Sequence, residues 1–166
     1  MNNWPRLVQI AWILHDQNGA TIAQECFIIK PDGLTRPADA SRIHGITTEN
    51  AKKGVDVLGV LNDFHSHVES SQYLIAHNIN FDKNIVGAEF LRAKMKNPVP
   101  NNKLICTMRG SVNYCALNGP YGYKYPKLIE LHRKLFNCSF DGAHGTSADI
   151  TATSKCFWEM RKRGLI

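Results

Sequence analysis

The chain has 166 residues, 43% hydrophobic and 20% charged, which allows one domain with a buried core and is not the composition of a disordered protein. Its formal net charge of +6 at pH 7 favours polyanionic partners, and five cysteines without CxxC spacing argue against a disulfide framework or a thiolate zinc site. No apolar run reaches the roughly 20 residues of a membrane span, and residues 1–9 show no signal-peptide n-region or cleavage site, so we expect a cytoplasmic protein without membrane contacts.

The first part of the chain reads as a hairpin followed by helices. Residues 6–14 form a nearly continuous apolar run, and residues 21–29 return as a second strand after an Asn-Gly turn. Asp16 falls in that turn. Short helical pieces are expected over residues 38–53, and apolar residues at helical spacing predict a helix over residues 55–70.

The second part of the chain alternates short buried strands with helices. The predicted strands and helices are, in order, residues 73–78, 79–95, 104–108, 113–117, 127–136 and 146–163. Because these elements follow an antiparallel hairpin, we expect a single α/β domain over residues 1–166, built on a mixed sheet.

A first group of polar residues stands in AHNINFDKN, residues 76–84, where a strand ends and a helix begins. It contains His77, Asn78, Phe81 and Asp82. In open α/β sheets, ligands bind at the carboxyl ends of strands. Considered alone, however, the aspartate is explained by the helix macrodipole, and the histidine by a hydrogen-bonded place in the core.

A second group stands in DGAHGTSADI, residues 141–150, where His144 lies in a Gly-rich turn and Asp149 follows in the final helix. A carboxylate facing back toward that turn can hold a divalent metal while the imidazole acts on a water molecule. Phosphodiester bonds are cut in this way by in-line attack, usually with two metals. The plainer alternative for the histidine is a turn residue bonded to a nearby carbonyl.

A strand that ends in HNxxFD, followed much later by GAHxxxxD, resembles the second and third motifs of the DEDDh (DnaQ-like) 3′–5′ exonucleases. That family includes the proofreading epsilon subunit of bacterial DNA polymerase III. IHGIT, residues 43–47, resembles a family segment in which a His-Gly turn lies against the terminal nucleotide. The resemblance covers essentially the whole chain in order and implies a ribonuclease-H-like fold, a mixed sheet flanked by helices.

The resemblance also implies a role for each matching residue. Asp149 would ligate a pair of Mg²⁺ or Mn²⁺ ions, Asp82 would reach them partly through water, and His144 would deprotonate the attacking water. The remaining matches would shape the substrate pocket or lie near the 3′ nucleotide: His44, Gly45, His77, Asn78 and Phe81.

The family's first motif, an Asp-x-Glu pair on the first and central strand, has no match here. Residues 6–14 resemble the strand that comes second in relatives, so we interpret the chain as N-terminally truncated and lacking that strand. With Asp82 and Asp149 alone, we expect weak metal binding and little or no nuclease activity. The two sheet edges left open would then close on each other or pair with another chain by self-association, unless the natural protein is longer, which we favour.

The sequence thus predicts a 3′–5′ exonuclease that acts on single-stranded 3′ ends, with DNA favoured over RNA and a DNA polymerase as a candidate partner. An RNA-trimming relative stays open, because contacts to the 2′-OH are not readable from sequence. A catalytically inactive nucleic-acid-binding or accessory protein is the second alternative, and a chance match in an unrelated α/β domain is the third. Residues 113–127, rich in Tyr and Lys, could track a single strand by stacking, although a packed surface loop explains them equally.

Overall fold

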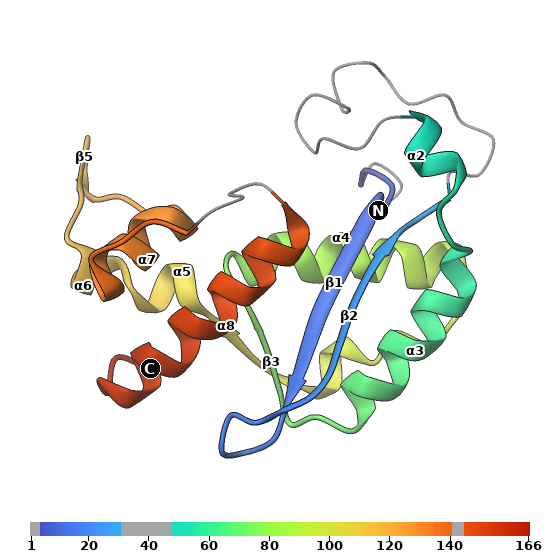
Figure 1. Cartoon of the computed structure of the whole chain (residues 1–166), viewed down its shortest axis with the longest axis horizontal. Coiled ribbons are helices and arrows are strands. Elements are labelled where there is room, and N and C mark those ends of the chain that lie inside the picture. Colours follow the sequence, from blue (N-terminus) through green and yellow to red (C-terminus); the bar gives the residue numbers. More distant parts are fainter. Residues whose placement is uncertain (1–3, 31–47, 141–144) are drawn as a thin grey trace.

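The structure is a computed structural model that describes residues 4–30, 48–140 and 145–166. No helix in these ranges is long and apolar enough to cross a membrane. Figure 1 shows a layered α/β arrangement with the following elements: β1 (Gln9–His15), β2 (Thr21–Ile28), α2 (Thr48–Lys52), α3 (Val57–Glu69), β3 (Tyr73–Ala76), α4 (Ile79–Arg92), a 3-10 turn η1 (Val99–Asn101), β4 (Lys103–Cys106), α5 (Thr107–Gly110), α6 (Val112–Cys115), β5 (Asn118–Gly119), β6 (Gly122–Tyr123), α7 (Leu128–Phe136) and α8 (Thr146–Lys162).

The predicted hairpin is confirmed. β1 and β2 pair antiparallel, with Gln9 opposite Ile28 at one end. The turn between them is closed by Asp16, whose Oδ1 accepts the backbone N–H of Asn18 and of Ala20, both at 2.8 Å. This carboxylate therefore serves the turn, as its sequence position indicated.

The main core lies between the hairpin and helices α3 and α4. Trp12 is 7% exposed and meets Phe64 edge-on, with ring centroids 5.3 Å apart. Its indole N–H donates to Nδ1 of His67 at 2.9 Å, so the buried polar group of the ring is satisfied. The buried members of this core are Ile10, Trp12, Ile29, Val57, Val60, Leu61, Phe64, Val68, Val86, Phe90 and Val99.

Helix α8 covers the other face of β1. Near its start the Thr146 hydroxyl donates to Oε1 of Gln9 at 2.8 Å, and further along Ser154 Oγ lies 2.8 Å from Nε2 of His15. The first half of the helix therefore contacts both ends of the strand, and in Figure 1 the rest of α8 diverges from β1 toward α6 and α7. Its far end packs with α6 and α7 around a second core of Cys115, Leu131, Leu135, Cys156 and Met160.

The central sheet is divided in two. β3 and β4 pair in parallel from Tyr73 opposite Lys103 to Ala76 opposite Cys106, and within the described ranges neither strand pairs with β1. The expectation that the two open edges close directly on each other is thus wrong for this part of the chain. Helices hold the two pairs in place: α8 packs on β1, α5 packs on β3, and α4 packs on β3 while also contributing to the core beneath the hairpin. In the described residues, β1 and β3 each keep one edge without a partner strand.

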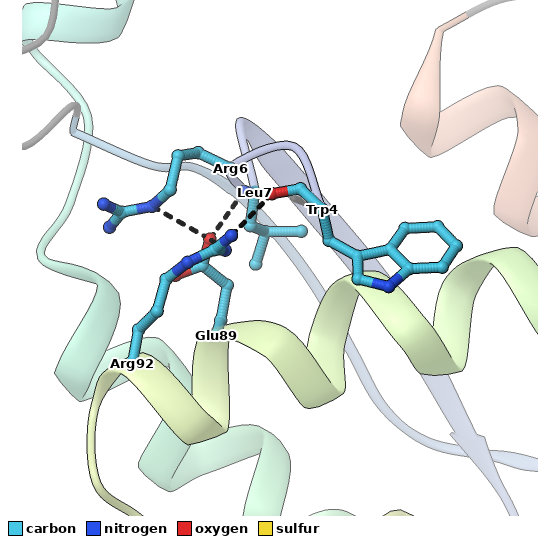
Figure 2. Close-up of polar contacts among 5 residues, drawn as sticks. All are labelled: Trp4, Arg6, Leu7, Glu89 and Arg92. Carbon is cyan, nitrogen blue, oxygen red and sulfur yellow. Dashed lines mark hydrogen bonds and ion pairs between the residues drawn. The ribbon is translucent and has the colours of Figure 1, made fainter. Parts of the chain in front are cut away.

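A buried acid on α4 ties this helix to the segment that leads into β1. Glu89 is 2% exposed, and its Oε1 accepts the Arg6 side chain at 3.1 Å and the Leu7 backbone N–H at 2.9 Å. The same oxygen accepts Arg92 at 2.9 Å, and Arg92 also donates to the carbonyl oxygen of Trp4 (Figure 2). We call this set of contacts the Glu89 anchor. It fixes α4 against the start of β1.

Candidate functional site

His77 follows β3 directly and joins three parts of the fold. Its Nδ1 lies 3.0 Å from Oγ1 of Thr107, which is fully buried, and its Nε2 lies 3.0 Å from the carbonyl oxygen of Pro126. Because a carbonyl only accepts, the proton of the neutral ring belongs on Nε2. Both ring nitrogens are therefore engaged, and the histidine links the end of β3 to α5 and to the segment before α7.

Asp149 lies half-buried in the first turn of α8. Burial lowers the pKa of His77 below its ordinary value, against the opposing effects of the Pro126 carbonyl and of the negative charge of Asp149. The fold thus brings the first turn of α8 into the electrostatic neighbourhood of the end of β3. These are the two segments in which the sequence placed the candidate chemistry.

Asn78 and Phe81 form the turn from β3 into α4. Asn78 adopts the left-handed conformation with φ of 78°, which asparagine tolerates better than most residues, and its carbonyl accepts the N–H of Phe81 at 2.8 Å. The ring of Phe81 is 52% exposed and meets Trp4 edge-on, with centroids 6.4 Å apart. The Glu89 anchor, which holds the backbone of Trp4, therefore also supports the aromatic side of this turn.

Asp82 occupies the first turn of α4 but does not cap the helix, since the N-cap position is Asn78. The residue is exposed, yet the surrounding protein partly desolvates its carboxylate, and this raises its pKa from 3.8 to about 6. Desolvation thus outweighs the favourable field of the helix N-terminus. A carboxylate perturbed in this way, at the end of a strand, is typical of a functional position.

Asp82→Asn is expected to stabilise the protein above about pH 7 and to leave its stability unchanged below about pH 4. An acid whose pKa is higher in the folded than in the unfolded state favours folding while it is protonated, and this advantage is lost as the pH rises through the folded-state pKa of about 6. Thermal unfolding in EDTA across this pH range measures the gap between variant and parent. Asp63→Asn, an exposed acid on α3, is the control. A gap that is constant with pH would contradict the assignment.

Three of the predicted site residues lie outside the described residues: His44, Gly45 and His144. Within the described ranges, no group of three or more His, Cys, Asp or Glu side chains is placed to hold a metal ion. Asp82 and Asp149 are the predicted metal ligands that the structure describes.

Sequence reasoning missed the residues that support this site. Thr107 and Pro126 carry no signal in the sequence, because they meet His77 only through the tertiary fold. Glu89 did carry a signal, since an acid next to a buried phenylalanine within a helix requires partners. The sequence does not reveal Arg6 and Leu7 as its partners, because they come from a distant segment.

Residues 2–157 match the family model named RNase T and described as an exonuclease. The chain is also 37% identical, over 62 residues, to DNA polymerase III subunit epsilon of Buchnera aphidicola subsp. Schizaphis graminum. That match covers 37% of this chain and 26% of the epsilon subunit, so the chain spans about a quarter of that relative's length.

Solved structures of exonucleases have a fold similar to that of this chain. E. coli exonuclease I in complex with a dA16 oligonucleotide superposes with a TM-score of 0.74 and 21% identity, over 94% of this chain and 37% of that one. Exonuclease X in complex with 5′ overhanging duplex DNA superposes with a TM-score of 0.65 and 22% identity, over 97% of this chain and 86% of that one. The likeness confirms the expected ribonuclease-H-like exonuclease fold.

Proposed function

This chain belongs to the DnaQ-like (RNase T) exonuclease family, and we propose that it takes part in hydrolysis of phosphodiester bonds at the 3′ end of single-stranded DNA. The observation that carries the proposal is the electrostatic influence of Asp149, in the first turn of α8, on His77 at the end of β3, where the negative charge raises the pKa of the histidine against the effect of burial. We propose DNA instead of RNA as the substrate because the structures of exonuclease I and exonuclease X contain bound DNA. An RNA-trimming activity is the alternative within the family.

Asp82 and Asp149 suit a divalent metal in kind but not in number. Carboxylate oxygens are the ligands that Mg²⁺ and Mn²⁺ prefer, and exonucleases of this family generally use divalent metals. Two cations held close together, however, need more carboxylates than two, together with the substrate phosphate. We therefore propose that a strand carrying an Asp-x-Glu pair completes the site between the free edges of β1 and β3.

The chain's own residues would divide the work of hydrolysis. Asp149 would hold a cation directly, and Asp82 would hold it partly through water; a cation bound there supplies Lewis acidity that lowers the pKa of a bound water. His144 would accept the proton of the attacking water. His77 is unsuited to that role, because burial lowers its pKa and both of its ring nitrogens already have partners.

The biological setting is proposed from the relatives. The match to an epsilon subunit supports an association with a DNA polymerase, in the cytoplasm, for proofreading or repair. A nucleic-acid-binding protein without catalysis is the second candidate, and the small number of carboxylates among the described residues favours it. The two candidates differ in whether product appears when divalent metal is added.

The direct test is Asp149→Asn in an assay with single-stranded oligonucleotides labelled at the 5′ end. The parent chain is expected to shorten the label-bearing strand from its 3′ end slowly, in the presence of Mn²⁺ and at high enzyme concentration. The variant is expected to shorten the strand more than about 100-fold more slowly than the parent. Removing a residue that only hydrogen-bonds to a metal ligand costs roughly 10–100-fold, and losing the ligand itself should cost more. Equal rates for the two proteins, or immediate release of a labelled mononucleotide, would refute the proposal.

A further inference from the structure

Three exposed tyrosines stand near the β5–β6 hairpin, and the proposed site makes no use of them. Tyr121 is 103% exposed, Tyr123 54% and Tyr125 59%. Figure 1 shows β5 on a loop that projects from the end of the molecule occupied by α6 and α7. Side chains of this size are ordinarily half-buried or better in a folded protein, so three of them exposed within five residues mark a binding surface.

The backbone of this segment is fixed, although its tyrosines are exposed. Gly119 pairs with Gly122, whose φ of 120° suits glycine alone, and the N–H of Lys124 donates to the carbonyl of Leu117 at 2.9 Å. The side chain of Lys124 turns to Glu130, with its Nζ 2.6 Å from Oε1. The tyrosines on either side of it, Tyr123 and Tyr125, keep their side chains exposed.

The tyrosine segment leads directly to the candidate site. The residue after Tyr125 is Pro126, which is fully buried and whose carbonyl oxygen is held by Nε2 of His77 at 3.0 Å. One residue further on, the backbone N–H of Lys127 donates to Glu130 at 2.7 Å. One hydrogen bond thus ties the segment that carries the exposed rings to the end of β3, and a second holds the same segment to α7.

The charge around this segment suits an anionic ligand. Between residues 109 and 134 the only acid is Glu130, whereas the cations are Arg109, Lys124, Lys127, Arg133 and Lys134. Alternate residues of an extended strand stand about 6.6 Å apart. This is about twice the 3.4 Å rise of stacked bases, so one base would fit between the rings of Tyr123 and Tyr125 at the spacing of an extended chain.

We propose that Tyr121, Tyr123 and Tyr125 form a stacking track for the unpaired bases of a nucleic-acid strand whose 3′ end lies in the candidate site. The inference rests on the proposed function for its direction and names the part of the molecule that holds the strand upstream of its end. Stacking on aromatic rings is tolerant of sequence, because every base has a π-face. The track therefore confers affinity for long single strands rather than selectivity for a base.

The test measures binding in EDTA, where hydrolysis does not occur. Binding is followed by the fluorescence anisotropy of two fluorescein-labelled oligothymidylates. One has about 20 nucleotides and is longer than a typical binding site, and the other has about 4 and is comparable to a short one. Replacing all three tyrosines with alanine is expected to weaken binding of the long oligomer by roughly tenfold for each ring, and binding of the short one far less. Replacing all three with phenylalanine is expected to keep both affinities.

Two controls separate the track from a general effect on folding. Tyr73→Ala removes another tyrosine, 45% exposed at the opposite end of β3 from His77, and is expected to bind like the parent. Tyr121→Ala alone removes a side chain with no buried surface to lose, so its thermal midpoint is expected to equal that of the parent. A loss of affinity with an unchanged midpoint then belongs to the ring itself.

Unchanged binding of the long oligomer by the alanine variants overturns the track, and so does a parent that binds neither oligomer. In either case the tyrosines would serve a protein partner instead. Because binding is measured in EDTA and hydrolysis in Mn²⁺, the two proposals are tested apart. Tyrosine-dependent binding without metal-dependent hydrolysis supports the track alone, and hydrolysis with tyrosine-independent binding overturns the track and supports the enzymatic proposal alone.

Discussion

Joining a strand-forming segment with an Asp-x-Glu pair ahead of residue 1 is expected to raise metal-dependent removal of 3′ nucleotides by more than about a hundredfold over the chain alone. β1 and β3 each have a free edge in the described part of the chain, so an added strand has backbone partners on both sides. Its two acids would join Asp82 and Asp149, which makes four carboxylates available to a pair of divalent cations.

The matched control is the same segment with Asn-x-Gln in place of the acids. Both segments are expected to raise the thermal midpoint, because either one pairs the open edges, but only the acidic one should raise the rate. The affinity for Mn²⁺, measured by calorimetric titration, should change in parallel with the rate. Tight binding is expected only when all four acids are present. Tight binding by the chain without any added segment would show that the described carboxylates suffice and that the added strand is not required.

Glu89→Ala is expected to lower the free energy of unfolding by about 1.5–3 kcal/mol, the range for losing hydrogen bonds to a charged group. The carboxylate is 2% exposed, and its removal takes away the acceptor that the Arg6 and Arg92 side chains and the N–H of Leu7 share. Urea denaturation measures the loss. Arg6 and Leu7 are distant from Glu89 in the sequence, so the anchor is a tertiary contact. Its removal should therefore weaken the packing of α4 against the segment that leads into β1.

Glu69→Ala on α3 serves as the comparison. That acid is 52% exposed and pairs with His65 at 3.6 Å, so its removal is expected to cost less than about 1 kcal/mol. Glu89→Gln should fall between the two variants, because an amide oxygen still accepts a hydrogen bond but carries no charge. A Glu89→Ala protein as stable as Glu69→Ala would mean that the Glu89 anchor contributes no net stability.

The fold was predictable to the extent that local patterns determine it. Alternating and continuous apolar runs predicted β1, β2 and α3, and short apolar stretches between helices predicted β3 and β4, each within a few residues of the described bounds. The division of the sheet was predicted only indirectly, from the absence of the strand that is central in relatives. The sequence contains no information on how β1 and β3 lie when nothing pairs between them, because helices α4, α5 and α8 determine that.

The candidate site was predictable where its residues are consecutive in the sequence. His77 and Asp82 were grouped because they flank one strand-to-helix turn, and Asp149 because it follows a Gly-rich turn. The full hydrogen bonding of His77 was not predictable, since Thr107 and Pro126 lie on other elements. The raised pKa of Asp82 was equally hidden, because desolvation depends on tertiary surroundings.

The divided sheet has a consequence for how the protein opens. No backbone hydrogen bond joins the β1–β2 pair to the β3–β4 pair among the described residues, so the two pairs are coupled through packed side chains, chiefly those of α4. Asp82 lies on α4, which packs on β3, and Asp149 lies on α8, which packs on β1. A ligand held by both carboxylates would therefore add a direct link between the two strand pairs and raise the free energy of opening either one.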